Sequence, residues 1–244
     1  MHRILLVTTI ATVLTGLLCT VLKPNHEGPL PRGFQHPVIA AELVMNAAEI
    51  VQVYGTSAQS GACAAARPDA NEPWDCASMR TLRLNTWADF LFIACYGSML
   101  FFLGRSLRGR VGLAIAMLAP LAALADVVEN IGILRATAEP ASDALAAMIR
   151  TPSLIKWALL GLIWTALWRR FFVLAAWRRG FSAWGFVEAA VGGFYAAGGL
   201  LCLWALIDGN ALVEIGAALL APAFIGQLVI LWFDRGFIER LDAA

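Results

Sequence analysis

The chain has 244 residues, of which 60% are hydrophobic and only 14% are charged, and its formal net charge is +1. A soluble domain carries roughly 25% charged residues, so this chain has more apolar surface than a water-soluble fold of its size can bury. Its near-neutral balance excludes the concentrated basic face that a nucleic-acid partner requires. The composition predicts one all-α bundle in a membrane, with membrane lipids as partners.

Six apolar segments are predicted to cross the membrane as helices. The hydrocarbon core requires about 20 residues of helix, and backbone groups in lipid must be hydrogen-bonded within their own segment. The first apolar run lacks a small-x-small cleavage site, which favours an uncleaved anchor over a secretory signal. We predict a single polytopic domain over residues 1–244, with an extracytoplasmic loop over 23–85. The predicted spans are residues 4–22, 87–103, 111–134, 154–168, 183–207 and 211–233.

The arginines of the short links predict the orientation of these spans. Cytoplasmic links of multi-pass proteins carry an excess of Lys and Arg, whereas long loops are translocated largely regardless of charge. The link at 208–210 has no basic residue, so it is assigned to the outer side. We therefore expect both termini in the cytoplasm and the protein in a bacterial inner membrane. The arginines that decide this are Arg105, Arg108, Arg110, Arg169, Arg170, Arg178 and Arg179.

The predicted outer loop holds one helix and two cysteines. Residues 37–54 are predicted as a helix because Glu42, Asn46 and Glu49 recur at helical spacing among apolar residues. This helix is expected to lie on the outer membrane face, to cap the bundle, or to enter the membrane as a short re-entrant segment. Cys63 and Cys76 are predicted to form a disulfide, with two free thiols as the alternative.

Polar residues within the spans form a second pattern. Asp126, Glu129 and Asn130 share one helix face, since offsets of three and four residues bring side chains together. Ionisable groups inside a membrane are costly, and each one requires a partner or a function. We predict that polar residues from four spans converge in the outer half of the membrane to form a ligand-binding set. Its members are Asp89, Tyr96, Asp126, Glu129, Asn130, Lys156 and Glu214.

An alternative interpretation makes these residues a structural network. Asp126 would pair with Lys156, and Asp89 or Glu129 would pair with Arg83 or Arg135. Such ion pairs lock neighbouring helices together without binding a ligand. Both interpretations predict that the charged residues lie close together.

Two short motifs within this set resemble a known pattern. The sequences Asp89-Phe90-Leu91-Phe92 with Tyr96, Asp126-Val127-Val128-Glu129-Asn130, and Lys156 are similar to those of a group of bacterial multi-pass membrane proteins. The resemblance covers roughly the second to fourth spans. It implies that these residues act as one set, but it brings no established activity with it.

Three functions remain open at this point. The first is binding or transport of a small cationic or amphiphilic, lipid-like ligand at an outer-half acidic pocket. The second is a membrane-embedded lipid-modifying enzyme with Asp126 or Glu129 as general acid or base. The third is a non-catalytic subunit or scaffold of a membrane complex, docked through residues 169–179. The sequence identifies no catalytic residues, cofactor or protein partner. No metal site is assigned: His2, His26 and His36 lie outside the spans, which argues against a histidine-based site. A carboxylate site for Mg²⁺ or Ca²⁺ at Asp89, Asp126 and Glu129 stays open.

Overall fold

In a computed structural model, every regular element among the described residues is helical. The structure describes the chain except residues 27, 56–73, 172–181, 209–210, 237–238 and 240–244. Six of the described helices are long and apolar enough to cross a membrane, which confirms the predicted polytopic bundle. These are α1 (His2–Val21), α4 (Trp74–Ser106), α5 (Gly109–Ala136), α6 (Asp143–Trp168), α8 (Ala183–Asp208) and α9 (Leu212–Phe233).

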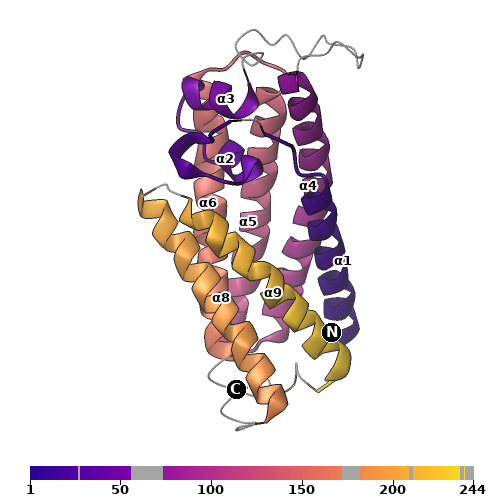
Figure 1. Cartoon of the computed structure of the whole chain (residues 1–244). Helices are drawn as coiled ribbons and strands as arrows, with labels where there is room; N and C mark the ends of the chain where they lie inside the picture. The colour runs from indigo at the N-terminus through magenta and orange to yellow at the C-terminus, as the bar shows by residue number, and fades with distance from the viewer. Residues whose placement is uncertain (27, 56–73, 172–181, 209–210, 237–238, 240–244) are drawn as a thin grey trace.

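The six long helices form a ring in chain order. Each helix packs against the next, and α1 closes the ring against α9. The start of α1 and the end of α9 lie at one end of the bundle, and the short helices α2 (Pro37–Glu42) and α3 (Ala47–Tyr54) lie at the other (Figure 1). We call the latter the α2 end. From the shared lower end in the view, α1 and α9 diverge toward the α2 end (Figure 1).

Two of the helices begin earlier than hydropathy predicted. Helix α4 begins at Trp74 rather than residue 87, and α6 begins at Asp143 rather than residue 154. At about 1.5 Å per residue the 33 residues of α4 extend roughly 50 Å, whereas the hydrocarbon core is about 30 Å thick. Hydropathy marks only the part of a helix that lies in lipid, so the polar first turns were missed. Ser142 starts α6 by accepting the backbone N–H of Leu145 at 3.2 Å.

The single helix predicted over residues 37–54 is wrong, because two helices occupy this segment. Asn46 caps α3 by accepting the backbone N–H of Glu49 at 3.0 Å, and Glu49 Oε2 accepts the N–H of Met45 at 2.9 Å. These reciprocal bonds fix a new helix start and end the helical course of α2. The backbone carbonyl oxygens at the end of α2 have no partner within that helix and accept hydrogen bonds from side chains instead. Ser153 donates to the carbonyl of Glu42 at 2.7 Å, and the Arg32 guanidinium donates to that of Leu43.

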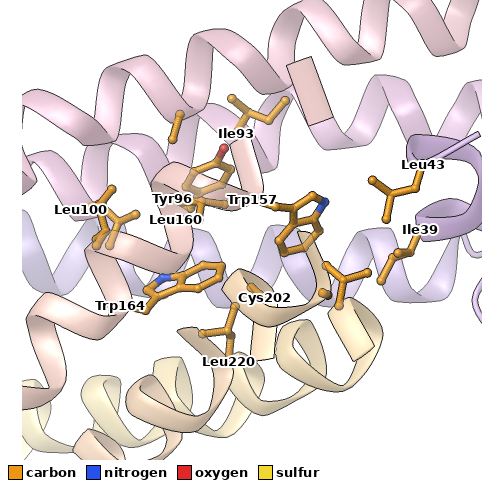
Figure 2. Close-up of a cluster of buried hydrophobic side chains, with 14 of the residues drawn as sticks. Ile39, Leu43, Ile93, Tyr96, Leu100, Trp157, Leu160, Trp164, Cys202 and Leu220 are labelled. Atoms are coloured by element: carbon orange, nitrogen blue, oxygen red, sulfur yellow. The ribbon is translucent and has the colours of Figure 1, made fainter. Parts of the chain in front are cut away.

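Helix α2 is built into the bundle rather than lying on its surface. Five of its six residues are buried, and Ile39 and Leu43 lie over Trp157 of α6 (Figure 2). Below them, the rings of Trp157 and Trp164 are 6.4 Å apart and continue the core between α4, α6, α8 and α9 (Figure 2). The segment therefore caps the bundle, one of the three placements expected from the sequence.

The predicted cysteine pair falls partly outside the described residues. Cys76 is buried near the start of α4 and is disulfide-bonded, whereas Cys63 lies outside the described part of the chain. The pairing of Cys76 with Cys63 therefore stays a prediction. Cys19, Cys95 and Cys202 are free thiols within the helices.

Candidate functional site

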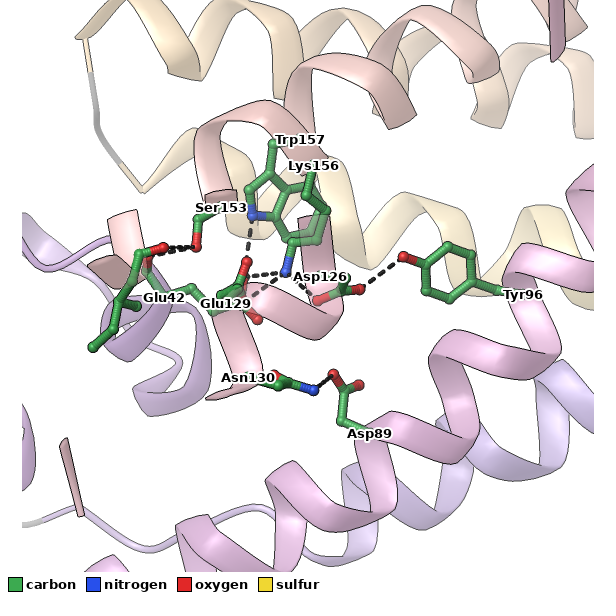
Figure 3. Close-up of polar contacts among 10 residues, drawn as sticks. Glu42, Asp89, Tyr96, Asp126, Glu129, Asn130, Ser153, Lys156 and Trp157 are labelled. Carbon is green, nitrogen blue, oxygen red and sulfur yellow. Dashed lines mark hydrogen bonds and ion pairs between the residues drawn. The ribbon is translucent and has the colours of Figure 1, made fainter. Parts of the chain in front are cut away.

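The ammonium group of Lys156 is the centre of a buried charged cluster. Its Nζ lies 2.8 Å from Glu129 Oε1, 2.9 Å from Glu42 Oε2 and 3.1 Å from Asp126 Oδ1 (Figure 3). Asp126 and Glu129 lie on one face of α5, and Glu42 comes from the last turn of α2. All four residues are buried, and Glu129 is fully inaccessible. Three carboxyl groups therefore share one cation.

A second layer of hydrogen bonds extends the cluster to α4. Tyr96 donates to Asp126 Oδ2 at 2.7 Å, and Asn130 Nδ2 donates to Asp89 Oδ2 at 2.9 Å (Figure 3). On the other side, Trp157 Nε1 donates to Glu42 Oε2 at 3.1 Å. Each of these donors orients a carboxyl group without neutralising its charge.

The cluster has an excess of carboxyl groups. Glu42, Asp89, Asp126 and Glu129 face one ammonium, and every ion pair that they form within the described residues is with Lys156. Buried charge without a counter-charge is strongly unfavourable, so the excess must be met by protons or by another cation. Burial raises the pKa of the Glu42 carboxyl above its ordinary value, and Lys156 opposes this effect. In addition, Glu129 Oε2 has no hydrogen-bond partner among the residues that the structure describes.

A cavity of about 260 Å³ opens beside these charges. Four charged residues, Glu42, Asp89, Asp126 and Lys156, form its polar end. Asp89 is the least buried of these four residues. The remaining wall is apolar and aromatic and comes mainly from α1, α6 and α9. Its aromatic members are Phe92, Tyr96, Trp157, Trp164 and Phe224.

Six of the seven residues predicted as one set lie together, and Glu214 does not. Its carboxylate instead accepts the backbone N–H groups of Gln35 and His36, at 3.0 and 2.7 Å, and so anchors the segment that leads into α2. The alternative pairing is also only partly met. Lys156 pairs with Asp126 as expected, but Arg135 pairs with Glu139 on the surface rather than with Glu129 or Asp89.

Sequence reasoning missed three residues of the cluster: Glu42, Ser153 and Trp157. Glu42 was noted only as part of the outer helix, since nothing in a linear sequence shows that this helix enters the bundle. A signal for Ser153 and Trp157 was present, because both lie within one turn of Lys156 on α6.

The carboxyl groups of the cluster converge on an organic cation, the ammonium group of Lys156. Within the described ranges, no group of three or more His, Cys, Asp or Glu residues is placed to hold a metal ion. Three of the carboxyl groups are paired with an ammonium, and the cavity adjoins Asp89.

Comparison of the chain with protein-family models, with curated proteins and with solved structures finds no match. The function must therefore be argued from the cluster and its cavity alone.

Proposed function

We propose that this protein binds, and carries across or within the membrane, an amphiphilic organic cation whose charged head lies at Asp89 and Asp126. The observation that supports this most directly is the charge excess at the polar end of an otherwise apolar cavity. A cationic head would replace the missing counter-charge, and an apolar body would fill the rest of the cavity. A neutral or anionic ligand would leave the excess carboxyl groups to be neutralised by protons alone.

The aromatic wall supports a cation of low hydration, such as a substituted ammonium. Ring faces attract such cations, and the effect increases where water is excluded. Lys156 itself lies 4.9 Å from the centre of the Trp157 ring, so the cavity already accommodates one ammonium beside an aromatic side chain. Phe92, Tyr96 and Trp164 offer further faces along the cavity.

Binding is favoured over the lipid-modifying enzyme by the state of Asp126 and Glu129. These are the carboxyl groups that such an enzyme would use as acid or base, and both are held by Lys156. The scaffold hypothesis relied on residues 169–179, of which 172–179 lie outside the described part of the chain. In the proposed binding site, Lys156 would balance part of the negative charge of the carboxyl groups, and Asp89 would receive the cationic head of the ligand.

We also propose that the protein resides in a bacterial inner membrane with both termini in the cytoplasm. The start of α1, the end of α9 and the arginine-rich link between α4 and α5 lie at the same end of the bundle (Figure 1). This agrees with the excess of Arg in cytoplasmic links. The α2 end would then face the outside, and fusions of alkaline phosphatase to Gly55 and to the C-terminus test it: only the first should be active.

The experiment that tests the function measures binding of dodecyltrimethylammonium to the protein in phosphatidylcholine nanodiscs. Asp89→Asn should weaken binding at least tenfold, because it removes a charge next to the ligand while Asn130 keeps a hydrogen-bond partner. Glu139→Gln is the matched control, since Glu139 is exposed and pairs with Arg135 at the surface. Equal affinity of the wild type, Asp89→Asn and Glu139→Gln, or saturable binding in none of them, would refute the proposal.

A further inference from the structure

The cavity has two walls that belong to the closing seam of the helix ring. Thr12, Val13, Gly16, Leu17 and Thr20 of α1 line one side of it. The facing side is formed by α9, and its lining residues are Ala217, Leu220, Ala221, Phe224 and Ile225. The cavity thus lies between the first and last membrane helices, where the chain itself provides no connection.

The seam is open toward the lipid at this level. Leu17 and Ile225 line the cavity and yet are 55% and 50% exposed, so both belong to the cavity wall and to the outer surface. Ala221, about one turn before Ile225 on α9, also lines the cavity and is exposed. Residues that face both ways mark an opening, because the side chains of a closed seam would be buried.

Below the cavity the same two helices are joined. Gln227 of α9 donates from Nε2 to the hydroxyl of Thr9 on α1 at 3.2 Å, and both side chains are fully buried. These residues lie within about one turn of Ile225 and Thr12, the last lining residues in that direction. The opening is therefore bounded at one end, and it lies within the membrane-spanning part of both helices, where α1 and α9 diverge toward the α2 end (Figure 1).

The aqueous route from the α2 end is obstructed. Ala40 and Ala41 of α2 are fully buried, and Ile39 and Leu43 cover Trp157 (Figure 2). Glu42 fastens this cap to Lys156 and Trp157 from within. A ligand that entered from water would have to break these charged contacts, whereas one that entered from lipid would meet mainly apolar side chains, with the hydroxyls of Thr12 and Thr20 already bonded to the α1 backbone.

We propose that the gap between α1 and α9 is a lateral portal through which a membrane-dissolved, single-chain or double-chain lipid amphiphile enters the cavity from the leaflet on the α2 side. The ligand would slide in with its chain between Leu17 and Ala221 and bring its head to Asp89. Its source is thus the bilayer and not the surrounding water. Since the cationic head group is taken from the proposed function, the route is tested with a lipid and without measuring cation binding.

The test uses the full chain in phosphatidylcholine vesicles that contain a phosphatidylcholine with a diazirine in its acyl chain. After illumination, labelled residues are mapped by mass spectrometry. Leu160 is buried, lines the cavity and belongs to α6 on its far side, so labelling at Leu160 reports an acyl chain inside. Trp204 is 60% exposed on α8 and should be labelled in every sample as an outer-surface reference.

Ala221→Trp should obstruct the portal and lower labelling of Leu160 at least fivefold relative to Trp204. Ala218→Trp is the matched control, because Ala218 is also exposed on α9 but does not line the cavity, and it should leave the ratio unchanged. Labelling confined to outward-facing residues, or labelling of Leu160 that Ala221→Trp does not reduce, would overturn the portal. Binding of dodecyltrimethylammonium by the wild type is measured in a separate experiment. The proposed ligand and the proposed route can therefore fail independently of each other.

Discussion

Two buried polar groups hold the bundle together, and they differ in kind. At the α2 end, Lys156 meets Glu42, Asp126 and Glu129, so the contacts are ionic and the carboxyl groups are in excess. At the opposite end, Tyr195 donates to Gln227 at 2.7 Å and Gln227 donates to Thr9 at 3.2 Å. We call these three residues the neutral triad.

The neutral triad shows what helix association requires. It links α8, α9 and α1 with uncharged side chains, and Thr9 passes the chain of bonds on to the carbonyl of Leu5 at 2.7 Å. Such bonds stabilise membrane bundles modestly and carry no desolvation penalty for charge. If the Lys156 cluster served only to hold helices together, uncharged hydrogen bonds like those of the neutral triad would suffice. The surplus of charge beside a cavity therefore favours a role in binding.

The largest expected effect comes from removing the shared cation. Lys156→Met leaves three buried carboxyl groups without their counter-charge and should lower the free energy of unfolding by about 3–5 kcal/mol. The measurement is denaturant unfolding in detergent micelles. In a Glu42→Gln/Asp126→Asn/Glu129→Gln background the same substitution should have a far smaller effect.

Arg135→Met is the control for that comparison, since it breaks an exposed pair with Glu139 and should leave stability unchanged. If Lys156→Met unfolded no more readily than Arg135→Met, the charged cluster would have no stabilising partner in Lys156, and the contrast with the neutral triad would fail.

The next effect concerns binding rather than stability. Asp126→Asn/Glu129→Gln lowers the charge excess, so an amphiphile that co-purifies with the wild type should be lost from the variant. Native mass spectrometry of gently solubilised protein would detect the missing mass. The variant must retain its melting temperature within a few degrees. A variant that unfolds readily, with no bound molecule in the wild type either, would make the cluster a structural ion-pair network.

A smaller effect is expected at the neutral triad. Gln227→Leu leaves the hydroxyl groups of Tyr195 and Thr9 without their partner and should lower the free energy of unfolding by about 1 kcal/mol. Affinity for dodecyltrimethylammonium should stay within twofold of the wild type, because the triad lies beyond the cavity. A large loss of affinity with unchanged stability would mean that this end also takes part in binding.

The sequence predicted the membrane class and the six spans because length and hydropathy decide them. It also brought together Asp89, Tyr96, Asp126, Glu129, Asn130 and Lys156, since cost in lipid forces buried polar residues to find one another. Helix starts at Trp74 and Asp143 were missed because the turns outside lipid need not be apolar.

The errors at Glu42 and Glu214 have a common cause. Each lies near the end of a helix, where hydropathy cannot say whether a carboxylate meets water, a backbone amide or a buried lysine. Three-dimensional packing decided both cases: α2 carries Glu42 into the bundle, and Glu214 bonds the amides of Gln35 and His36 instead. The Asn46-x-x-Glu49 cap was visible in the sequence and would have divided the predicted 37–54 helix.

The smallest effect expected is a loosening of the α2 cap at mildly acidic pH. His36 immediately precedes α2, and burial, aided by the nearby charge of Lys23, lowers its pKa from 6.5 to about 4. The undocked segment therefore binds a proton more readily than the docked one between these values. Docking is unaffected above pH 6.5 and weakens as the pH falls toward 4. The raised pKa of Glu42 has the opposite effect on docking of the cap. As the pH falls, the docked Glu42 binds a proton more readily than the undocked one, which favours docking.

Hydrogen exchange of the α2 amides at pH 7 and pH 5, corrected for the intrinsic rate, separates the two groups. Wild-type protein should lose protection at pH 5 relative to His36→Gln, which lacks the imidazole that takes up the proton. Amides around Gln227 should show no corrected difference, because the neutral triad carries no charge to gain or lose in this range. Equal protection of α2 in the wild type and His36→Gln at both pH values would show that His36 does not restrain the cap. A pH-dependent change in protection confined to the amides around Gln227 would reverse the assignment of the pH-sensitive and pH-insensitive ends. Proton uptake is expected at the end that holds the buried charged groups.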